Sequence, residues 1–315
     1  MFVILLAMKN TPLGFLSGWS YERLNILHQI AGYATVVHVI IHGASYAMAF
    51  DELGLLARFQ EVKDACGIVA GFAFVFVAIA AIFIRPWYYE LFYIIHVSFW
   101  MVAVVTFAIH QPDFAMPFIY MTIVVAGLWI LDRTIRFLRL MFYTANNSVS
   151  LTPLTHKGTL VTLPKAPIGA APGQHCFLWI PKLRRFETHP FTITSVNPLQ
   201  FVVASHDGFT QELHQYAIDH PGQPLSASVE GAYGSFPSPM KFDKVLLIAG
   251  GSGASFTFGL AKRILEHKTN VHASQRISLV WSVKQHCKFT LITNFLYPLT
   301  RLSLFGVVCY SSGGF

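Results

Sequence analysis

Two apolar stretches carry histidine at the same interval: HQIAGYATVVHVIIH runs from His28 to His42, and HVSFWMVAVVTFAIH runs from His96 to His110. A spacing of 14 residues puts two side chains on one face of an α-helix, within roughly 40° in angle and about 21 Å apart along the axis. Ionisable residues inside membrane helices are costly and are typical of functional sites. The two stretches therefore predict two membrane-spanning helices, each with histidine at two depths.

Four segments are long and apolar enough to cross about 30 Å of hydrocarbon as helices. They are residues 27–50, 66–84, 91–108, and 116–131 with an extension toward residue 140. One span separates the two histidine-bearing segments, so these two helices run in the same direction. His28 should then lie level with His96, and His42 with His110.

Each level offers two imidazoles from facing helices, the arrangement that holds a haem iron by two axial histidines. We therefore predict two haem b groups, one held by His28 and His96 and the other by His42 and His110. A zinc site or proton relay would not require the same interval twice, whereas isolated histidines bonded to the backbone remain an alternative. His38 has no counterpart on the other helix and is expected to be a polar interior residue or, on helical phase alone, a ligand in place of His42.

The composition supports a membrane domain followed by a soluble one. Of the 315 residues, 54% are apolar and 12% are charged, and the mean hydropathy is +0.52. The first 140 residues hold eight basic and eight acidic side chains, so the net charge of +7 lies in the remainder. Phosphorylated cofactors suit that charge. A nucleic-acid partner is not expected, because the basic residues are dispersed.

The distribution of arginines predicts the orientation, since Lys and Arg concentrate on the cytosolic side of a membrane. The side that carries Arg85, Arg133, Arg136 and Arg139 is expected to be cytosolic, and the C-terminal half with it. The four cysteines have no disulfide or zinc-type spacing. Met1 to Met8 is apolar but too short to cross a bilayer, and we expect it to be the end of a span whose beginning lies outside the sequence.

From about residue 149 the pattern changes to short runs separated by Pro and Gly, which predicts an antiparallel β-barrel. The expected strands are residues 149–154, 158–163, 176–180, 191–195 and 199–204. The segment His189-Pro190-Phe191-Thr192-Ile193-Thr194-Ser195 combines a donor, an aromatic ring and hydroxyls on one strand. A flavin needs an aromatic face and hydrogen-bond donors, although Thr and Phe are also simply good strand residues.

Farther along, an apolar strand over Lys244 to Ala249 leads into Gly250-Gly251-Ser252-Gly253, and a helix is predicted from Ala254 to about Glu266. In this order the backbone N–H groups and a helix N-terminus can face a phosphate. The segment from Arg276 to Val283 reads as a second strand of the same sheet.

Taken together and in this order, these features resemble the ferric reductase transmembrane family of fungi, relatives of the NADPH oxidases. The segments that carry the resemblance, besides the histidine pairs, are Ser20-Tyr21-Glu22-Arg23-Leu24-Asn25, His189-Pro190-Phe191-Thr192, Val229-Glu230-Gly231-Ala232-Tyr233-Gly234 and Gly250-Gly251-Ser252-Gly253-Ala254. The likeness extends to about Lys284.

The resemblance implies a multi-domain fold: a helical transmembrane haem domain over residues 1–140, an antiparallel FAD-binding β-barrel over 141–240, and a partial α/β NADPH-binding domain over 241–315. It implies that His189 lies near the FAD phosphates, Phe191 stacks on the isoalloxazine and Thr192 bonds near N5. Pro190, Thr194 and Ser195 complete the expected flavin site, and residues 250–253 would receive NADPH. No side chain is expected to be catalytic, because the cofactors carry the chemistry.

By the same resemblance, electrons pass from NADPH to FAD, to the haem of His28 and His96, to the second haem, and then to ferric or cupric chelates on the far face. The protein would reside in the plasma membrane, with the vacuolar membrane as an alternative. One competing function is a superoxide-producing NADPH oxidase, and another is a truncated haem-binding membrane protein without catalytic activity.

Some features depart from the family. Ala232 replaces a usual proline, and Tyr33 stands where many members have a basic residue. By comparison with the family, we expect a first span and half of another to lie outside the sequence. Residues 287–315 follow no recognised pattern, and Cys309 is followed by Tyr310 where the family has a Cys-Gly segment. We therefore expect the chain to be truncated at both ends, with an incomplete nucleotide domain.

Overall fold

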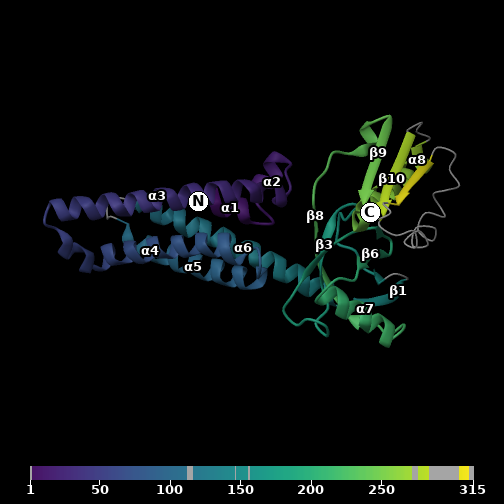
Figure 1. The fold of residues 1–315 in the computed structure, drawn as a ribbon, viewed down its shortest axis with the longest axis horizontal. Coiled ribbons are helices and arrows are strands. Elements are labelled where there is room, and N and C mark those ends of the chain that lie inside the picture. The colour runs from purple at the N-terminus through teal and green to yellow at the C-terminus, as the bar shows by residue number, and fades with distance from the viewer. Residues whose placement is uncertain are drawn as a thin grey trace. The chain divides into compact units, whose positions relative to one another are not determined.

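The computed structural model describes residues 2–111, 116–145, 147–154, 157–271, 276–283 and 305–311. The chain divides into two compact units, Met1–Thr134 and Ile135–Phe315. In Figure 1 the first unit is made of helices, and the second contains all of the labelled strands. Each unit is described by itself below.

Four helices in the described ranges are long and apolar enough to cross a membrane, as predicted. They are α3 (Tyr21–Glu52), α4 (Val62–Ile79) with its π-helical continuation η2 (Ala80–Ile84), α5 (Tyr89–His110) and α6 (Met116–Thr144). Large apolar side chains such as Ile40, Phe72 and Val105 point outward and are exposed, as expected of surfaces that face lipid.

Helix α3 begins at Tyr21, six residues before the predicted span. Its first turn contains Glu22, which suits the positive end of the helix dipole but lies outside an apolar window. Hydropathy measures only the length of the apolar stretch, whereas the helix continues into the polar residues that flank it. The same reason explains why α6 continues to Thr144.

Two short helices precede the spans: α1 (Phe2–Ala7) and α2 (Pro12–Ser17). Leu6 of α1 and the following Met8 are buried. Asn10 is held by Asp132 of α6, whose Oδ1 accepts from the Asn10 backbone N–H at 3.0 Å and from its side-chain amide at 2.9 Å. The loop between α3 and α4 contains the short helix η1 (Leu56–Gln60).

The second unit contains an antiparallel β domain, as predicted. Its strands are β1 (Ser148–Leu154), β2 (Gly158–Leu163), β3 (His175–Trp179), β4 (His189–Thr192), β5 (Ser195–Val196), β6 (Leu199–Ala204), β7 (Leu225–Ser226) and β8 (Ser228–Tyr233). They form one sheet in the order β5-β6-β2-β1-β7 and another in the order β4-β3-β8. Helix α7 (Phe209–Asp219) packs against this domain.

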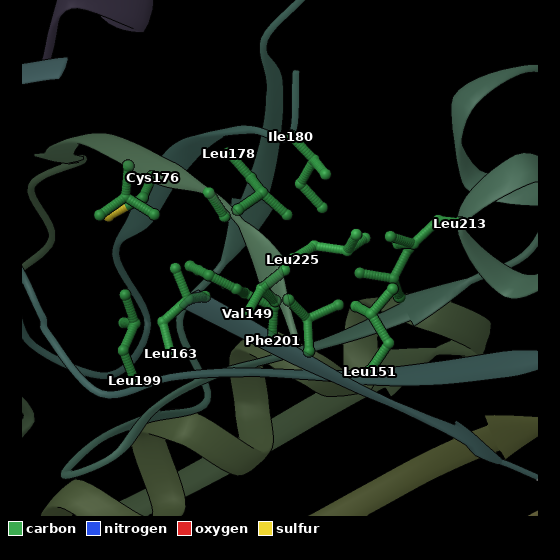
Figure 2. Packing of buried hydrophobic residues seen from close by; sticks show 14 of the residues in the cluster. Val149, Leu151, Leu163, Cys176, Leu178, Ile180, Leu199, Phe201, Leu213 and Leu225 are labelled. Carbon is green, nitrogen blue, oxygen red and sulfur yellow. The ribbon is translucent and has the colours of Figure 1, made fainter. Parts of the chain in front are cut away.

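The two sheets enclose one hydrophobic core. Figure 2 shows side chains of both sheets converging, with Cys176 and Leu178 from one side and Val149, Leu163 and Phe201 from the other. Every second residue of β6 is buried, the pattern of a strand with one face on a core. This core fixes the strands that carry the predicted flavin residues.

The single strand predicted over residues 191–195 is divided into β4 and β5. The backbone N–H of Ile193 bonds to the carbonyl of Gln174, before β3, whereas that of Thr194 bonds to the carbonyl of Gln200 in β6. The chain therefore changes sheets at this point. An alternating sequence pattern cannot show this change, because both halves remain extended.

The part predicted to bind a nucleotide is a parallel sheet in the order β11-β10-β9. It comprises β9 (Lys244–Gly250), η5 (Gly251–Gly253), α8 (Ala254–Val271), β10 (Arg276–Val283) and β11 (Phe305–Ser311), after the short helix η4 (Pro239–Lys241). The predicted strand over 276–283 is confirmed. Within residues 287–315, where no strand is predicted from the sequence, residues 305–311 form β11 and pair with β10 in parallel. The rest of that segment lies outside the described residues.

Candidate functional site

The predicted histidine pairs lie together between α3 and α5. The ring centroids of His28 and His96 are 6.2 Å apart, and those of His42 and His110 are 6.3 Å apart. A metal bound midway, with metal–nitrogen bonds of about 2 Å as is usual for histidine, would place two ring centroids roughly 6 Å apart. The spacing of both pairs thus fits one iron between each pair of imidazoles.

Three of these histidines bond to backbone carbonyls of other helices through Nδ1. The bonds join His28 to Val3, His96 to Val77 and His110 to Lys63, with N···O distances of 2.7, 3.3 and 2.9 Å. Since a carbonyl can only accept, each Nδ1 must carry the hydrogen. The other ring nitrogen, Nε2, is then the one with a free lone pair, which is the arrangement typical of metal-binding histidine.

A cavity of about 490 Å³ lies beside the second pair, within the range of about 300–1,000 Å³ typical of cofactor and ligand sites. Its wall includes His42 and His110 and several small residues of α3 and α4, among them Ala34, Gly67, Ala70 and Gly71. These small residues leave the space that a flat macrocycle requires.

His38 also lines this cavity. Its Nδ1 bonds to the carbonyl of Ala34, one turn earlier in the same helix, at 2.7 Å. The structure pairs His42, rather than His38, with His110. In the described part of the chain no three His, Cys, Asp or Glu side chains gather as a metal site, so two-histidine ligation is the metal chemistry that the spans offer.

The predicted flavin strand β4 borders β3. The ring of His189 stacks on that of Phe209, with 4.2 Å between the ring centroids and 16° between the ring planes, and its Nε2 lies 3.2 Å from Oε2 of Glu187. Phe191, two residues farther along the strand, points to the same side, and its ring centroid lies 6.1 Å from that of Phe209. Pro190 is exposed and Thr192 half-buried on the opposite side of the strand.

Thr194 and Ser195 lie deeper than the rest of the predicted flavin set, each 2% exposed. The Thr194 hydroxyl donates to the carbonyl of Gln200 at 2.9 Å, and the Ser195 hydroxyl accepts from Nζ of Lys262 at 2.8 Å. Both hydroxyls are engaged within the protein, and Ser195 joins the barrel to α8. Sequence reasoning missed this role because Lys262 is 67 residues away.

The glycine-rich turn connects β9 to α8 as predicted, and its backbone is open. For the described residues, no atom lies within 4 Å of where a Cβ would stand at Gly250, Gly251 or Gly253. Gly251 has φ of +51°, a conformation that favours glycine. Its carbonyl accepts from the indole N–H of Trp281 at 3.0 Å. An open glycine turn at a helix N-terminus can take a phosphate.

Three family models match successive parts of the chain. A model described as ferric reductase like transmembrane component matches residues 1–107, one described as FAD-binding domain matches 145–237, and one described as ferric reductase NAD binding domain matches 242–311. The last match continues through β11, which corrects the expectation that the likeness ends near residue 284. The second unit therefore carries an FAD-binding and an NAD-binding domain.

Relatives with the same order of segments come from fungi. "Probable cell surface ferric reductase kap2" of Aspergillus oryzae is 27% identical and aligns with 90% of this chain and 41% of its own length. "Ferric reductase transmembrane component 4" of Saccharomyces cerevisiae is 29% identical and aligns with 80% of this chain and 36% of its own length. "Ferric/cupric reductase transmembrane component 2" of Schizosaccharomyces pombe is 23% identical and aligns with 88% of this chain and 58% of its own length. The chain thus spans between about one third and three fifths of the length of these relatives.

Among solved structures, a ferredoxin reductase in carbazole 1,9a-dioxygenase matches 53% of this chain and 49% of its own, with 17% identity and a TM-score of 0.41. A ferredoxin NADP+ reductase from Neisseria gonorrhoeae matches 54% and 68%, also with 17% identity and a TM-score of 0.41.

Proposed function

Because the chain belongs to the family of fungal ferric reductase transmembrane components, we propose that it transfers electrons from NADPH across a membrane to ferric or cupric chelates. It is an integral membrane protein with four spans in its described residues and with FAD-binding and NAD-binding domains. The observation that carries the proposal is the pairing of histidines at two levels, at 6.2 and 6.3 Å.

In this proposal His28 and His96 hold one haem b, and His42 and His110 hold the other. Helices α3 and α5 run in the same direction, so the two levels are separated by 14 residues, or about 21 Å of helix. When bound, the haems, FAD and NADPH supply the redox chemistry. The protein supplies the axial imidazoles and fixes the tautomers of His28, His96 and His110 through backbone carbonyls.

The proposed FAD site is built on β4, in which Pro190 is exposed and the other three residues are half-buried. His189 and Phe191 are held by their stacking with Phe209, so their rings are preorganised before a flavin arrives. Pro190 and Thr192 face the other side of the strand. Thr194 and Ser195 are buried next to the site and bond to Gln200 and Lys262. The proposed NADPH phosphate site is the open turn of Gly250, Gly251, Ser252 and Gly253.

We propose that the protein resides in the plasma membrane, in keeping with the name of the Aspergillus oryzae relative, a probable cell surface ferric reductase, and that its flavin domain lies in the cytosol. Arg85 follows α4, and Arg133, Arg136 and Arg139 lie in the C-terminal half of α6. Since successive spans alternate in direction, the end of α4, the start of α5 and the end of α6 share one side. The guanidinium of Arg133 donates to the hydroxyl of Tyr93 in the first turns of α5 at 2.9 Å, as this arrangement requires.

A second candidate is a haem-binding membrane protein that NADPH does not reduce. The observation that favours it is the exposed second face of β9, where Leu246 and Ile248 are 61% and 69% exposed. Strands of a complete parallel sheet are buried on both faces. This candidate predicts the same histidine pairs but no electron input from NADPH.

Absorbance spectra of membranes that contain the chain separate the two candidates. We expect haem bands that dithionite and NADPH both reduce, and loss of one haem in His28→Ala and in His96→Ala. His38→Ala serves as the matched control, because this intramembrane histidine has no partner on α5 in the described structure and should retain both haems. Reduction by dithionite alone would support the second candidate. A wild-type chain without haem would contradict both.

A further inference from the structure

Helix α4 presents two backbone carbonyls to the two histidines of α5. The carbonyl of Lys63 bonds to Nδ1 of His110, and that of Val77 bonds to Nδ1 of His96. Lys63 and Val77 are 14 residues apart, the same interval as the two histidines. Because α4 and α5 are adjacent and antiparallel, the two carbonyls of α4 have the same spacing as the two histidines of α5 and lie opposite them.

A helix carbonyl is normally covered by the residue four positions later, whose N–H it accepts. For Lys63 that residue is Gly67. A Cβ at Gly67 would stand 2.5 Å from both Nδ1 and Cε1 of His110, and 2.9 Å from its Cγ. Only glycine at this position lets the imidazole reach the helix backbone without a shift of one of the two helices.

The carbonyl of Val77 is reached in a different way. It lies three residues before the π-helical segment Ala80–Ile84, in which the N–H of Arg85 bonds to the carbonyl of Ala80 five residues earlier. Segments of this kind interrupt the regular hydrogen-bond ladder of a helix and often occur at functional sites. The bond to His96 is longer, at 3.3 Å, so the two histidines of α5 are held differently.

We propose that Gly67 and the carbonyl of Lys63 position His110, holding its Nδ1–H and thereby turning Nε2 toward His42. This inference rests on the proposed two-haem function and assigns Gly67 as a positioning residue for one haem alone. When the ring nitrogen that does not bind the metal donates a hydrogen bond, here Nδ1, the histidine becomes a more basic ligand. Loss of the acceptor of that bond typically lowers metal affinity about 10- to 100-fold. The haem of His42 and His110 therefore depends on Gly67, and the haem of His28 and His96 does not.

The test compares Gly67→Ala with Gly127→Ala in the purified full chain. Gly127 lies in the span α6 and does not line the cavity, and an added Cβ there would meet no described atom within 4 Å. Each substitution is made in a His28→Ala background, which retains the pair His42 and His110, and in a His42→Ala background, which retains the other pair. Haem per chain, the electron paramagnetic resonance spectrum of the ferric haem and the midpoint potential are measured.

We expect Gly67→Ala to weaken haem binding about 10- to 100-fold, or to change the resonance spectrum and potential, in the His28→Ala background. The same substitution should leave the haem of the His42→Ala background unchanged, and Gly127→Ala should match its parent in both backgrounds. A Gly67→Ala protein that matches Gly127→Ala would overturn the inference while leaving the proposed function intact. Equal losses in both backgrounds would also overturn it, since they indicate a general packing defect. A wild-type chain that binds no haem would overturn the proposed function itself.

Discussion

Cys176 lies in the core of the β domain, fully buried on β3 (Figure 2). Burial, with a smaller contribution from the negative charge of Glu230, raises the pKa of this thiol from 9.0 to about 12. The thiolate is the reactive form of cysteine. Cys176 should therefore be inert at pH values where an exposed cysteine reacts.

We predict that iodoacetamide does not modify Cys176 at pH 9 in the folded chain and modifies it readily in urea, as measured by mass spectrometry. Thr152→Cys supplies the matched control, because this position is exposed on β1 of the same domain and should react in the folded state. Between pH 9 and 12 the unfolded chain releases the thiol proton while the folded chain keeps it. Stability of this domain should thus fall as pH rises through that window, and less so in Cys176→Ala.

At this scale the sequence predicted which histidines meet but not how they are held. The pairing of His28 with His96 follows from helical periodicity, which is a local property of the chain. The carbonyl partner of His110 depends on the register between α4 and α5, and that register is set by packing. A glycine four residues after Lys63 was visible, yet nothing in the sequence distinguished Gly67 from the many small residues of the spans.

At the scale of elements, the last turns of α6 are part of the C-terminal unit. Arg136 pairs with Glu230 of β8 at 3.4 Å, with side chains 18% and 4% exposed, and the hydroxyl of Ser228 donates to the carbonyl of Leu140 at 2.5 Å. The hydroxyl of Tyr233 also bonds to Glu230. These contacts attach the end of the span to the FAD-binding domain directly.

We predict that Arg136→Met destabilises this unit by about 3 kcal/mol, since it removes the ion pair that Arg136 makes with a buried carboxylate. The double substitution Arg136→Met with Glu230→Gln should recover a substantial part of that loss, because position 230 then carries no buried charge. Pulse proteolysis in urea, with the helices kept in detergent, measures the free energy of unfolding of Arg136→Met, of Glu230→Gln and of the double variant. If the double variant were as unstable as the sum of the two single ones, the pair would not be coupled.

Helix α8 approaches the barrel through Gly259. A Cβ there would stand 2.8 Å from the carbonyl oxygen of Ile193 and 3.1 Å from the backbone N of Gly173. We predict that Gly259→Ala lowers the stability of the C-terminal unit by about 1–3 kcal/mol, the usual cost of overpacking. Gly253→Ala, just before the same helix, meets no described atom within 4 Å and should not lower it. Similar unfolding midpoints for the two variants would contradict the close approach.

At the scale of the whole molecule, segment order was the most predictable property. Apolar length predicted the four spans, and strand–turn alternation predicted the β domain, because both signals are continuous over many residues. The third strand of the nucleotide domain was missed, since the pairing of β11 (Phe305–Ser311) with β10 is non-local. The division of β4 from β5 was missed for a similar reason, because it depends on which neighbouring strand each half bonds.

The two faces of the parallel sheet differ in exposure. Leu247 and Leu279 are buried on the face that packs with α8, whereas Leu246 and Ile248 of β9 are exposed on the other. We predict that Leu247→Ala costs about 2–5 kcal/mol, and that Leu246→Ser and Ile248→Ser each change stability by less than about 0.5 kcal/mol. Unfolding midpoints of the full chain in detergent measure both effects. Equal costs on the two faces would instead show that the second face is covered, as in a complete doubly wound sheet, and would strengthen the case for electron input from NADPH.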